Sequence, residues 1–361
     1  MLNSNASQPP SLSRSVLIFI LISVVLSVSG CGLFGIRKKV QVPQLLAPLT
    51  EADTARLIAE VNRLASVRSI HGKVDIEFED TSFAEVGVAE KYRRADGTVT
   101  LQRPGKIYLV ISVPFIASDI AQMTSNGETF RVAILQGEER YKRFLKGTND
   151  AAYEQLEMNG SAPTSKDKKR EMTGKETVSA LSNLRPQHLT EALLTSPIPD
   201  PSTTGLVYVR SEFYQEEPDT RPRANKSVRI VRGYYLLEET AQPANGEARL
   251  LRRFWFDRVN GIRLARLQTF DNRGALITDI SYWDEKPLGE TPQRVLPSRI
   301  EITRPRDKYK LRIVYQSPSS VVIEKEFQAE AFVLENRWQL PEVDLDERLR
   351  NKATPQSNSP R

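Results

Sequence analysis

Hydrophobic and polar residues alternate along long stretches of this chain, which is the pattern of β-strands with one buried and one solvated face. Val74, Ile76 and Phe78, for example, are interleaved with lysine, aspartate and glutamate. The Asp-Gly and Asn-Gly pairs at 96–97 and 126–127 favour the tight turns of antiparallel hairpins. Further strands are predicted over 98–102, 106–113, 129–135, 140–145, 206–213, 227–238, 250–256, 262–270, 276–283, 298–303, 308–315 and 321–324. About a dozen strands would leave costly open edges in a flat sheet, so we predict a mainly β (α+β) protein whose sheet curls into a barrel-like form.

Two segments show helical spacing instead of alternation. After Thr50, which with Asp53 resembles a capping box, Leu57, Val61 and Leu64 recur at intervals of three or four residues. The pattern therefore predicts an N-terminal helix that begins at Thr50 and packs its apolar stripe onto the strands.

The second helical segment covers 176–195 and carries Leu181, Leu184 and Leu189. Pro186 is expected to divide it into two short helices. The preceding stretch, 147–175, is polar and charged, and we interpret it as a mobile loop. The polar residues 346–361 at the end of the chain are predicted to be disordered.

The first thirty residues differ from the rest, because Arg14 is the only charged residue among them and an apolar run follows it over 16–28. This run is too short to cross a bilayer as a helix, so residues 1–30 are predicted to be a signal peptide. Small residues stand directly before Cys31, and this layout resembles the lipobox of bacterial lipoproteins. The resemblance implies cleavage before Cys31 and acylation of its thiol by membrane lipid. The alternatives are an ordinary secreted protein with a chance cysteine, or an uncleaved anchor.

Cys31 is the only cysteine of the chain, so an exported domain would have no disulfide and would depend on burial alone. Residues 31–49 are interpreted as a tether: three basic residues at 37–39 could contact lipid phosphates, and two prolines discourage regular structure.

The charge and composition of the chain are those of a soluble globular domain, with 39% hydrophobic and 27% charged residues. Cleavage removes Arg14 alone, so the formal charge of +6 becomes +5. Basic residues are interleaved with acidic ones and aromatic residues make up only 7%, so we predict no nucleic-acid partner.

Catalytic chemistry has few candidates, since the chain contains only two histidines, His71 and His188, and no recognisable nucleophile or metal-ligand motif. A site that joins both histidines on a metal is the alternative to ordinary surface or capping roles for each. The sequence therefore predicts no enzyme, no catalytic residue, no metal and no cofactor.

The order of elements resembles one known group of proteins. A short helix leads into the strand that follows Gly72, the run Gln102-Arg103-Pro104-Gly105-Lys106 ends another strand, and Val113-Pro114-Phe115 and Asn126-Gly127 come next. This order is similar to the LolA/LolB superfamily of periplasmic lipoprotein carriers and receptors. The resemblance covers a domain over 50–345 and is most specific at Arg103-Pro104-Gly105. Cys31 places the chain nearer the anchored receptor, although the mature chain is longer and the receptor's exposed apolar loop has only 113–116 as a counterpart.

The resemblance implies a half-open antiparallel β-barrel with a helical lid and an apolar interior for acyl chains. The residues that would line that interior are Val74, Ile76, Phe78, Leu109, Ile111, Phe130, Val132, Leu311 and Ile313. The residues that would cover it are Leu181, Leu184 and Leu189.

Two functions stay open from the sequence. The first is an anchored carrier or receptor that binds the acyl chains of lipids or lipoproteins, in the outer membrane facing the periplasm rather than in the inner membrane. The second is an anchored scaffold of the cell envelope, with a filled core and no ligand. An apolar cavity on the order of a few hundred Å³ would favour the first. The oligomeric state is left open.

Overall fold

The computed structural model describes residues 42–81, 90–91, 94–113, 118–137, 139, 142–151, 153, 184–219, 221, 228–242, 246–259, 261–290 and 294–353. The predicted signal peptide, Cys31, the segment 114–116, Leu181 and most of the predicted loop at 147–175 lie outside these residues. The chain divides into two compact units, Met1–Gln44 and Leu45–Arg361, and the account below concerns the second.

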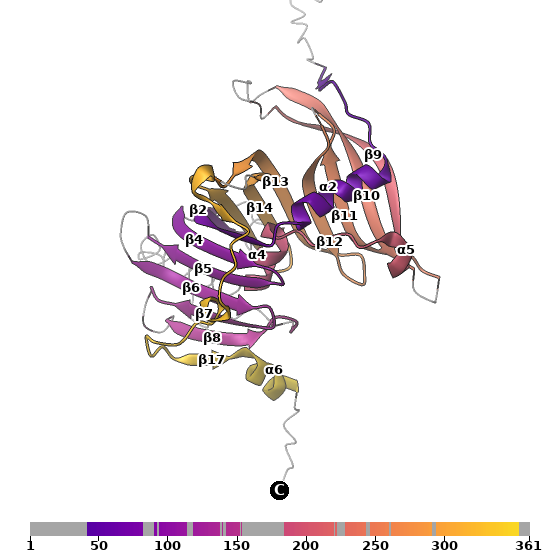
Figure 1. Ribbon diagram of the computed structural model, residues 1–361. Helices are drawn as coiled ribbons and strands as arrows, with labels where there is room; N and C mark the ends of the chain where they lie inside the picture. The colour runs from indigo at the N-terminus through magenta and orange to yellow at the C-terminus, as the bar shows by residue number, and fades with distance from the viewer. Residues whose placement is uncertain are drawn as a thin grey trace, which may run out of the picture. The chain divides into compact units, whose positions relative to one another are not determined.

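Most of this unit is one sheet (Figure 1). The strands are β1 (Gln44–Leu45), β2 (Ser69–Asp80), β3 (Glu90–Lys91), β4 (Ala95–Gln102), β5 (Lys106–Ser112), β6 (Asp119–Asn126), β7 (Thr129–Ile134), β8 (Arg143–Thr148), β9 (Leu206–Pro218), β10 (Arg229–Ala241), β11 (Arg249–Asp257), β12 (Arg263–Phe270), β13 (Leu276–Leu288), β14 (Arg294–Arg304), β15 (Tyr309–Tyr315), β16 (Val322–Ile323) and β17 (Glu342–Asp344).

The sheet is antiparallel from β9 through β10 to β15 in order, and β15 then pairs with β2. From β2 it continues through β4, β5, β6 and β7 to β8. Strand β17 is the exception, since it pairs with β8 in parallel. No pairing joins β9 to β17 within the described residues, so the sheet is not closed. The predicted mainly β, half-open antiparallel fold is confirmed.

The helices are α2 (Thr54–Ala65), α4 (Pro186–Leu193), α5 (Pro201–Thr204) and α6 (Leu345–Ala353), with short 3-10 turns η4 (Pro318–Ser320) and η5 (Ala329–Phe332). Figure 1 shows α2 crossing the strands β9–β12, and it contacts β9 and β12. Helix α4 packs on β5, β6 and β14.

The N-terminal helix begins later than predicted. Asp53, and not Thr50, is its N-cap: the Asp53 carboxylate accepts a hydrogen bond of 2.8 Å from the backbone N–H of Arg56. The Thr50 backbone is used elsewhere, since its N–H donates to the carbonyl of Arg258. The predicted stripe is correct, because Leu57, Val61 and Leu64 are all buried.

Within the stretch 31–49 predicted to be a tether, the residues from Leu45 on belong to the second compact unit. The N–H of Leu46 donates to the carbonyl of Val231 at 2.9 Å, and Leu49 forms a bridge with Val259. Burial of the Leu46 side chain, 8% exposed, explains why this short stretch joins the domain.

The tail predicted to be disordered from residue 346 contains α6, which extends to Ala353. Asp344 caps it by accepting a hydrogen bond from the N–H of Glu347, and two acidic residues in the first turn suit the positive end of the helix. Leu345 is buried and the hydroxyl of Thr148 donates to Asp346. The polar composition therefore hid a helix fixed at its first turn, while residues 354–361 lie outside the described residues.

Strand β6 was missed by the sequence pattern because its alternation of apolar and polar residues is short. Ala121 and Met123 lie in the apolar core, and Gln122 and Thr124 on the opposite face are also buried. The side chains of Gln122 and Thr124 accept hydrogen bonds from the Tyr108 hydroxyl and from the N–H of Leu334, respectively. Only these four residues alternate, since the apolar Ile120 and the polar Ser125 break the pattern on either side.

Candidate functional site

The residues predicted to line a cavity lie on one face of the sheet. Leu311 stands opposite Phe78, and Ile313 opposite Ile76. The same face continues across β4 to β7, where Leu109 pairs with Met123 and Met123 with Val132. All nine residues except Phe78 are at most 5% exposed. This face is therefore continuous and apolar, and its role in binding lipid stays a prediction.

Helix α4 covers part of this face. It begins at Pro186, where the missing N–H of proline costs no hydrogen bond, and the predicted helical stretch before it lies outside the described residues. Leu184 and Leu189, both predicted to belong to a lid, are 1% and 0% exposed. Leu181 lies outside the described residues.

The segment that leaves α4 is held by polar contacts. Asn62 of α2 forms two hydrogen bonds with the backbone of Ile198, one to its N–H and one to its carbonyl. Arg103 donates to the carbonyls of Val67 and Thr195, at 2.9 and 2.8 Å. The arginine of the Arg103-Pro104-Gly105 motif therefore joins the end of α2 to the exit of α4.

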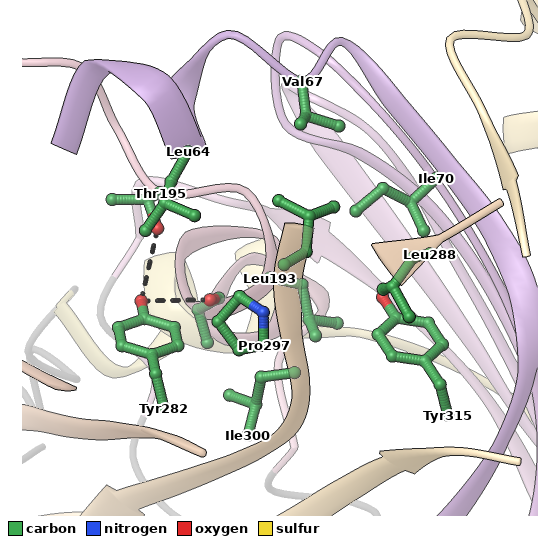
Figure 2. A pocket seen from close by; sticks show the side chains of 12 residues that line it. Leu64, Val67, Ile70, Leu193, Thr195, Tyr282, Leu288, Pro297, Ile300 and Tyr315 are labelled. Carbon is green, nitrogen blue, oxygen red and sulfur yellow. Dashed lines mark hydrogen bonds between the residues drawn. The ribbon is translucent and has the colours of Figure 1, made fainter. Parts of the chain in front are cut away.

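Between these elements lies a small apolar cavity of about 30 Å³, space for about one water molecule (Figure 2). Its walls come from the end of α2, the exit of α4 and the strands β2 and β13–β15. They are Leu64, Val67, Ile70, Ala192, Leu193, Thr195, Tyr282, Leu288, Leu296, Pro297, Ile300 and Tyr315. None of the nine predicted lining residues borders it, so the structure separates them from the cavity they were expected to form.

A wider hollow of about 300 Å³ does border Phe78 and Leu311. Its other walls are mainly charged, and Arg312 there pairs with Glu77 at 2.8 Å and with Glu301 at 3.0 Å. An acyl chain would gain little from such walls, so this hollow is a poor candidate for a lipid site.

Two tyrosines give the small cavity its polar groups. The Tyr282 hydroxyl donates to the carbonyl of Ala192 at 3.2 Å and lies 3.3 Å from the hydroxyl of Thr195 (Figure 2). Burial raises the pKa of Tyr282 to about 12. Burial also raises the pKa of Tyr315, whose hydroxyl has no hydrogen-bond partner within the described part of the chain. Both groups therefore stay neutral hydrogen-bond donors.

The two histidines have separate partners. His71 Nδ1 lies 2.8 Å from the hydroxyl of Thr100, and His188 Nδ1 lies 2.7 Å from the hydroxyl of Tyr309. His188, for which an ordinary surface or capping role was expected, is only 5% exposed and lies on α4. Burial, followed by the nearby Arg304 and Arg185, holds the pKa of His188 well below its ordinary value.

Sequence reasoning missed Tyr282, Asn62 and Tyr315 as parts of the site. Tyr315 had a signal, because it continues the alternation of Leu311 and Ile313 on the inward face of its strand. Tyr282 likewise continues an inward-facing row of its strand, but its partner, like that of Asn62, lies more than 80 positions away in the chain and no sequence pattern indicates it.

No helix in the described residues is both long and apolar enough to cross a membrane. No protein-family model matches the chain, and no curated protein sequence matches it.

Similar solved structures include three bacterial proteins, each 11% identical to the chain. A DUF1329 family protein from Desulfovibrio piger covers 77% of this chain and 94% of its own length, with a TM-score of 0.38. A LolA superfamily protein from Nitrosomonas europaea covers 78% and 99%, with a TM-score of 0.36. An outer membrane lipoprotein-sorting protein domain from Vibrio parahaemolyticus covers 76% and 94%, with a TM-score of 0.30. A LolA superfamily protein is thus among the solved structures that the chain resembles.

Proposed function

We propose that this protein is a membrane-anchored lipoprotein that binds acyl chains of lipids or lipoproteins on the apolar face beneath α4. Acylated Cys31 would hold it at the outer membrane, facing the periplasm. Its task would then be localisation of envelope lipids or lipoproteins rather than catalysis.

The observation that carries this proposal is an apolar sheet face covered by a short helix. Helix α4 has only eight residues, and Leu189 and Ala192 on it are buried. An acyl chain offers the same kind of surface, with about 0.8 kcal/mol for each buried methylene. Exchange of α4 side chains for an acyl chain would therefore replace one apolar contact by another, and it would have to break the hydrogen bonds of Ala192 with Tyr282 and of His188 with Tyr309.

The volume of the cavity favours the second candidate, an anchored scaffold without a ligand. At about 30 Å³ the cavity next to α4 is far smaller than a lipid site. In the carrier proposal, α4 must move before an acyl chain can enter. In the scaffold proposal, α4 is a permanent part of the core.

A binding assay separates the two functions. The whole chain with Cys31→Ala, which carries no acyl group of its own, would be titrated with a fluorescent long-chain fatty acyl probe. The carrier proposal expects saturable binding, and lipid that co-purifies with the protein should be detected by mass spectrometry. A chain that is folded by circular dichroism but binds no acyl probe would support the scaffold.

Leu189→Ala gives the sharper comparison. If α4 competes with the ligand, weaker packing of α4 should tighten binding of the probe by about fivefold or more, because less of the protein is held in the closed state. Leu145→Ala is the matched control, since Leu145 is also fully buried but lies on β8. It should lower stability similarly and leave the affinity for the probe unchanged. Equal affinities for both variants would contradict the competition by α4.

A further inference from the structure

The hydroxyl of Tyr315 is a buried polar group that the described protein does not satisfy. Tyr315 is 4% exposed, and its oxygen has no hydrogen-bond partner among the described residues. Figure 2 shows the Tyr315 ring among the side chains that line the cavity. Buried hydroxyls are nearly always hydrogen-bonded, so this one requires an explanation.

The position of the Tyr315 ring is fixed by its surroundings. The ring lies over Gly72 of β2, where a Cβ atom would come within 3.5 Å of Tyr315 Cδ1 and within 3.2 Å of Val321 Cγ2. Gly72 therefore provides the space that the ring fills. Because β15 pairs with β2 directly beside it, Tyr315 opposite Val74, the hydroxyl is held in place rather than left free to turn to solvent.

The other buried polar atoms without a partner belong to Asn149, Arg185, Arg249, Trp283 and Arg299, and none of these residues lines the cavity. Tyr282, on the other side of the cavity, has the same type of hydroxyl but uses it to hold Ala192. With α4 in place, Tyr315 is therefore the one tyrosine of the described walls whose hydroxyl has no partner.

We propose that the Tyr315 hydroxyl donates a hydrogen bond to the carbonyl oxygen at the head of an acyl chain, when that chain enters between α4 and the strands β13–β15. This inference rests on the proposed function and names its ligand more closely. The hydroxyl would mark the depth at which the apolar tail ends and the head group begins.

The charge of the site selects the form of the carbonyl. The residues that line the cavity include no lysine and no arginine, and Arg103, which contacts two of them, already donates to the carbonyls of Val67 and Thr195, so an ionised carboxylate would enter without a free counter-ion. Burial raises the pKa of Tyr315, which keeps the hydroxyl protonated as a donor. The site should therefore prefer a neutral ester or amide, as in a glycerolipid or an acylated lipoprotein, to a free fatty acid.

The experiment compares ligands that share one sixteen-carbon chain and differ in the head group, the ester and the ether only in the carbonyl. Methyl palmitate, palmityl methyl ether and ionised palmitate would each compete with the fluorescent acyl probe on the Cys31→Ala chain. We expect the ester to displace the probe at about fivefold lower concentration than the ether, as one hydrogen bond implies. Tyr315→Phe should abolish this difference, and ionised palmitate should compete less well than the ester.

Tyr282→Phe is the matched control, because it removes a hydroxyl from the opposite wall. It should lower the melting temperature, since Tyr282 loses a hydrogen bond, and leave the preference for the ester unchanged. Tyr315→Phe should leave the melting temperature unchanged or raise it by about 2–4 °C, because it removes an unsatisfied group.

The possible results separate the two proposals. If no competitor and no probe binds, the proposed function itself fails. If ester and ether bind equally, or if the preference survives in Tyr315→Phe, acyl binding stands and the assignment of Tyr315 is wrong; a hydroxyl that only holds a buried water would give this result. A preference for ionised palmitate would overturn the selection of a neutral head group.

Discussion

Protonation of His188 should loosen the domain as the pH falls. His188 is buried on α4 against Tyr309, and two guanidinium groups, those of Arg304 and Arg185, disfavour a positive charge there. Its pKa in the folded protein is well below the value near 6.5 expected in the unfolded chain. The unfolded state therefore takes up the proton first. The stabilisation by neutral His188 is complete above about pH 6.5 and is lost as the pH falls from there toward the folded pKa.

The size of the effect follows from one proton. The free energy of unfolding can fall by at most about 1.4 kcal/mol per pH unit for a single group. Between pH 7 and pH 5, and with His188 neutral throughout in the folded state, the loss sums to about 2 kcal/mol. His188→Gln keeps a neutral hydrogen-bonding group beside Tyr309 and has no proton to gain. The variant should lose about 2 kcal/mol less than the wild type over this range.

Two measurements test this prediction. The chain has only two histidines, so the ¹H NMR signals of their ring protons can be assigned with the single variants His188→Gln and His71→Gln. Urea unfolding of the wild type and of each variant at pH 7 and pH 5 then gives the free energies. His71 is the control, because its pKa is also lowered by burial but it lies on β2 away from α4. A His188 signal that titrates at pH 6.5, or an equal loss of stability in His188→Gln, would refute the reasoning.

Two further predictions concern the anchor and the entry to α2. Cys31→Ala should release the protein from membranes, since a cleaved chain would have no acyl group to hold it; a protein that still resists carbonate extraction would show another anchor. Arg258→Met should lower the free energy of unfolding by about 2–3 kcal/mol, because the 2% exposed guanidinium pairs with Glu51 and Glu212 and lies 4.2 Å from the Tyr235 ring. Glu51→Gln changes a carboxylate that is 77% exposed, so it should lower the free energy of unfolding by less than about 1 kcal/mol. Urea unfolding measures both variants, and equal losses of stability would contradict this account.

The strands could be predicted from the sequence where one face of the strand is buried and the other is exposed to solvent. The alternation of Val74, Ile76 and Phe78 predicts β2, and that of Leu311 and Ile313 predicts β15, because side chains in a strand point to opposite faces in turn. The same rule could not find β6, where only the four residues 121–124 alternate between apolar and polar. The start of α2 was misplaced because Thr50 and Asp53 both have side chains that can cap a helix, and the structure uses Asp53.

The chemistry of the cavity could not be predicted, because it depends on register between strands far apart in the sequence. Ile300 of β14 pairs with Tyr282 on one side and with Ile313 on the other, and this brings Tyr282 and Tyr315 to the walls of one cavity. The two tyrosines look alike in the sequence, since each continues an inward-facing row. Only the exit of α4 distinguishes them: it supplies the Ala192 carbonyl to Tyr282 and nothing to Tyr315. A polar group with one fixed position and no partner in the described part of the chain is a property of packing, and it is where a ligand can add a hydrogen bond.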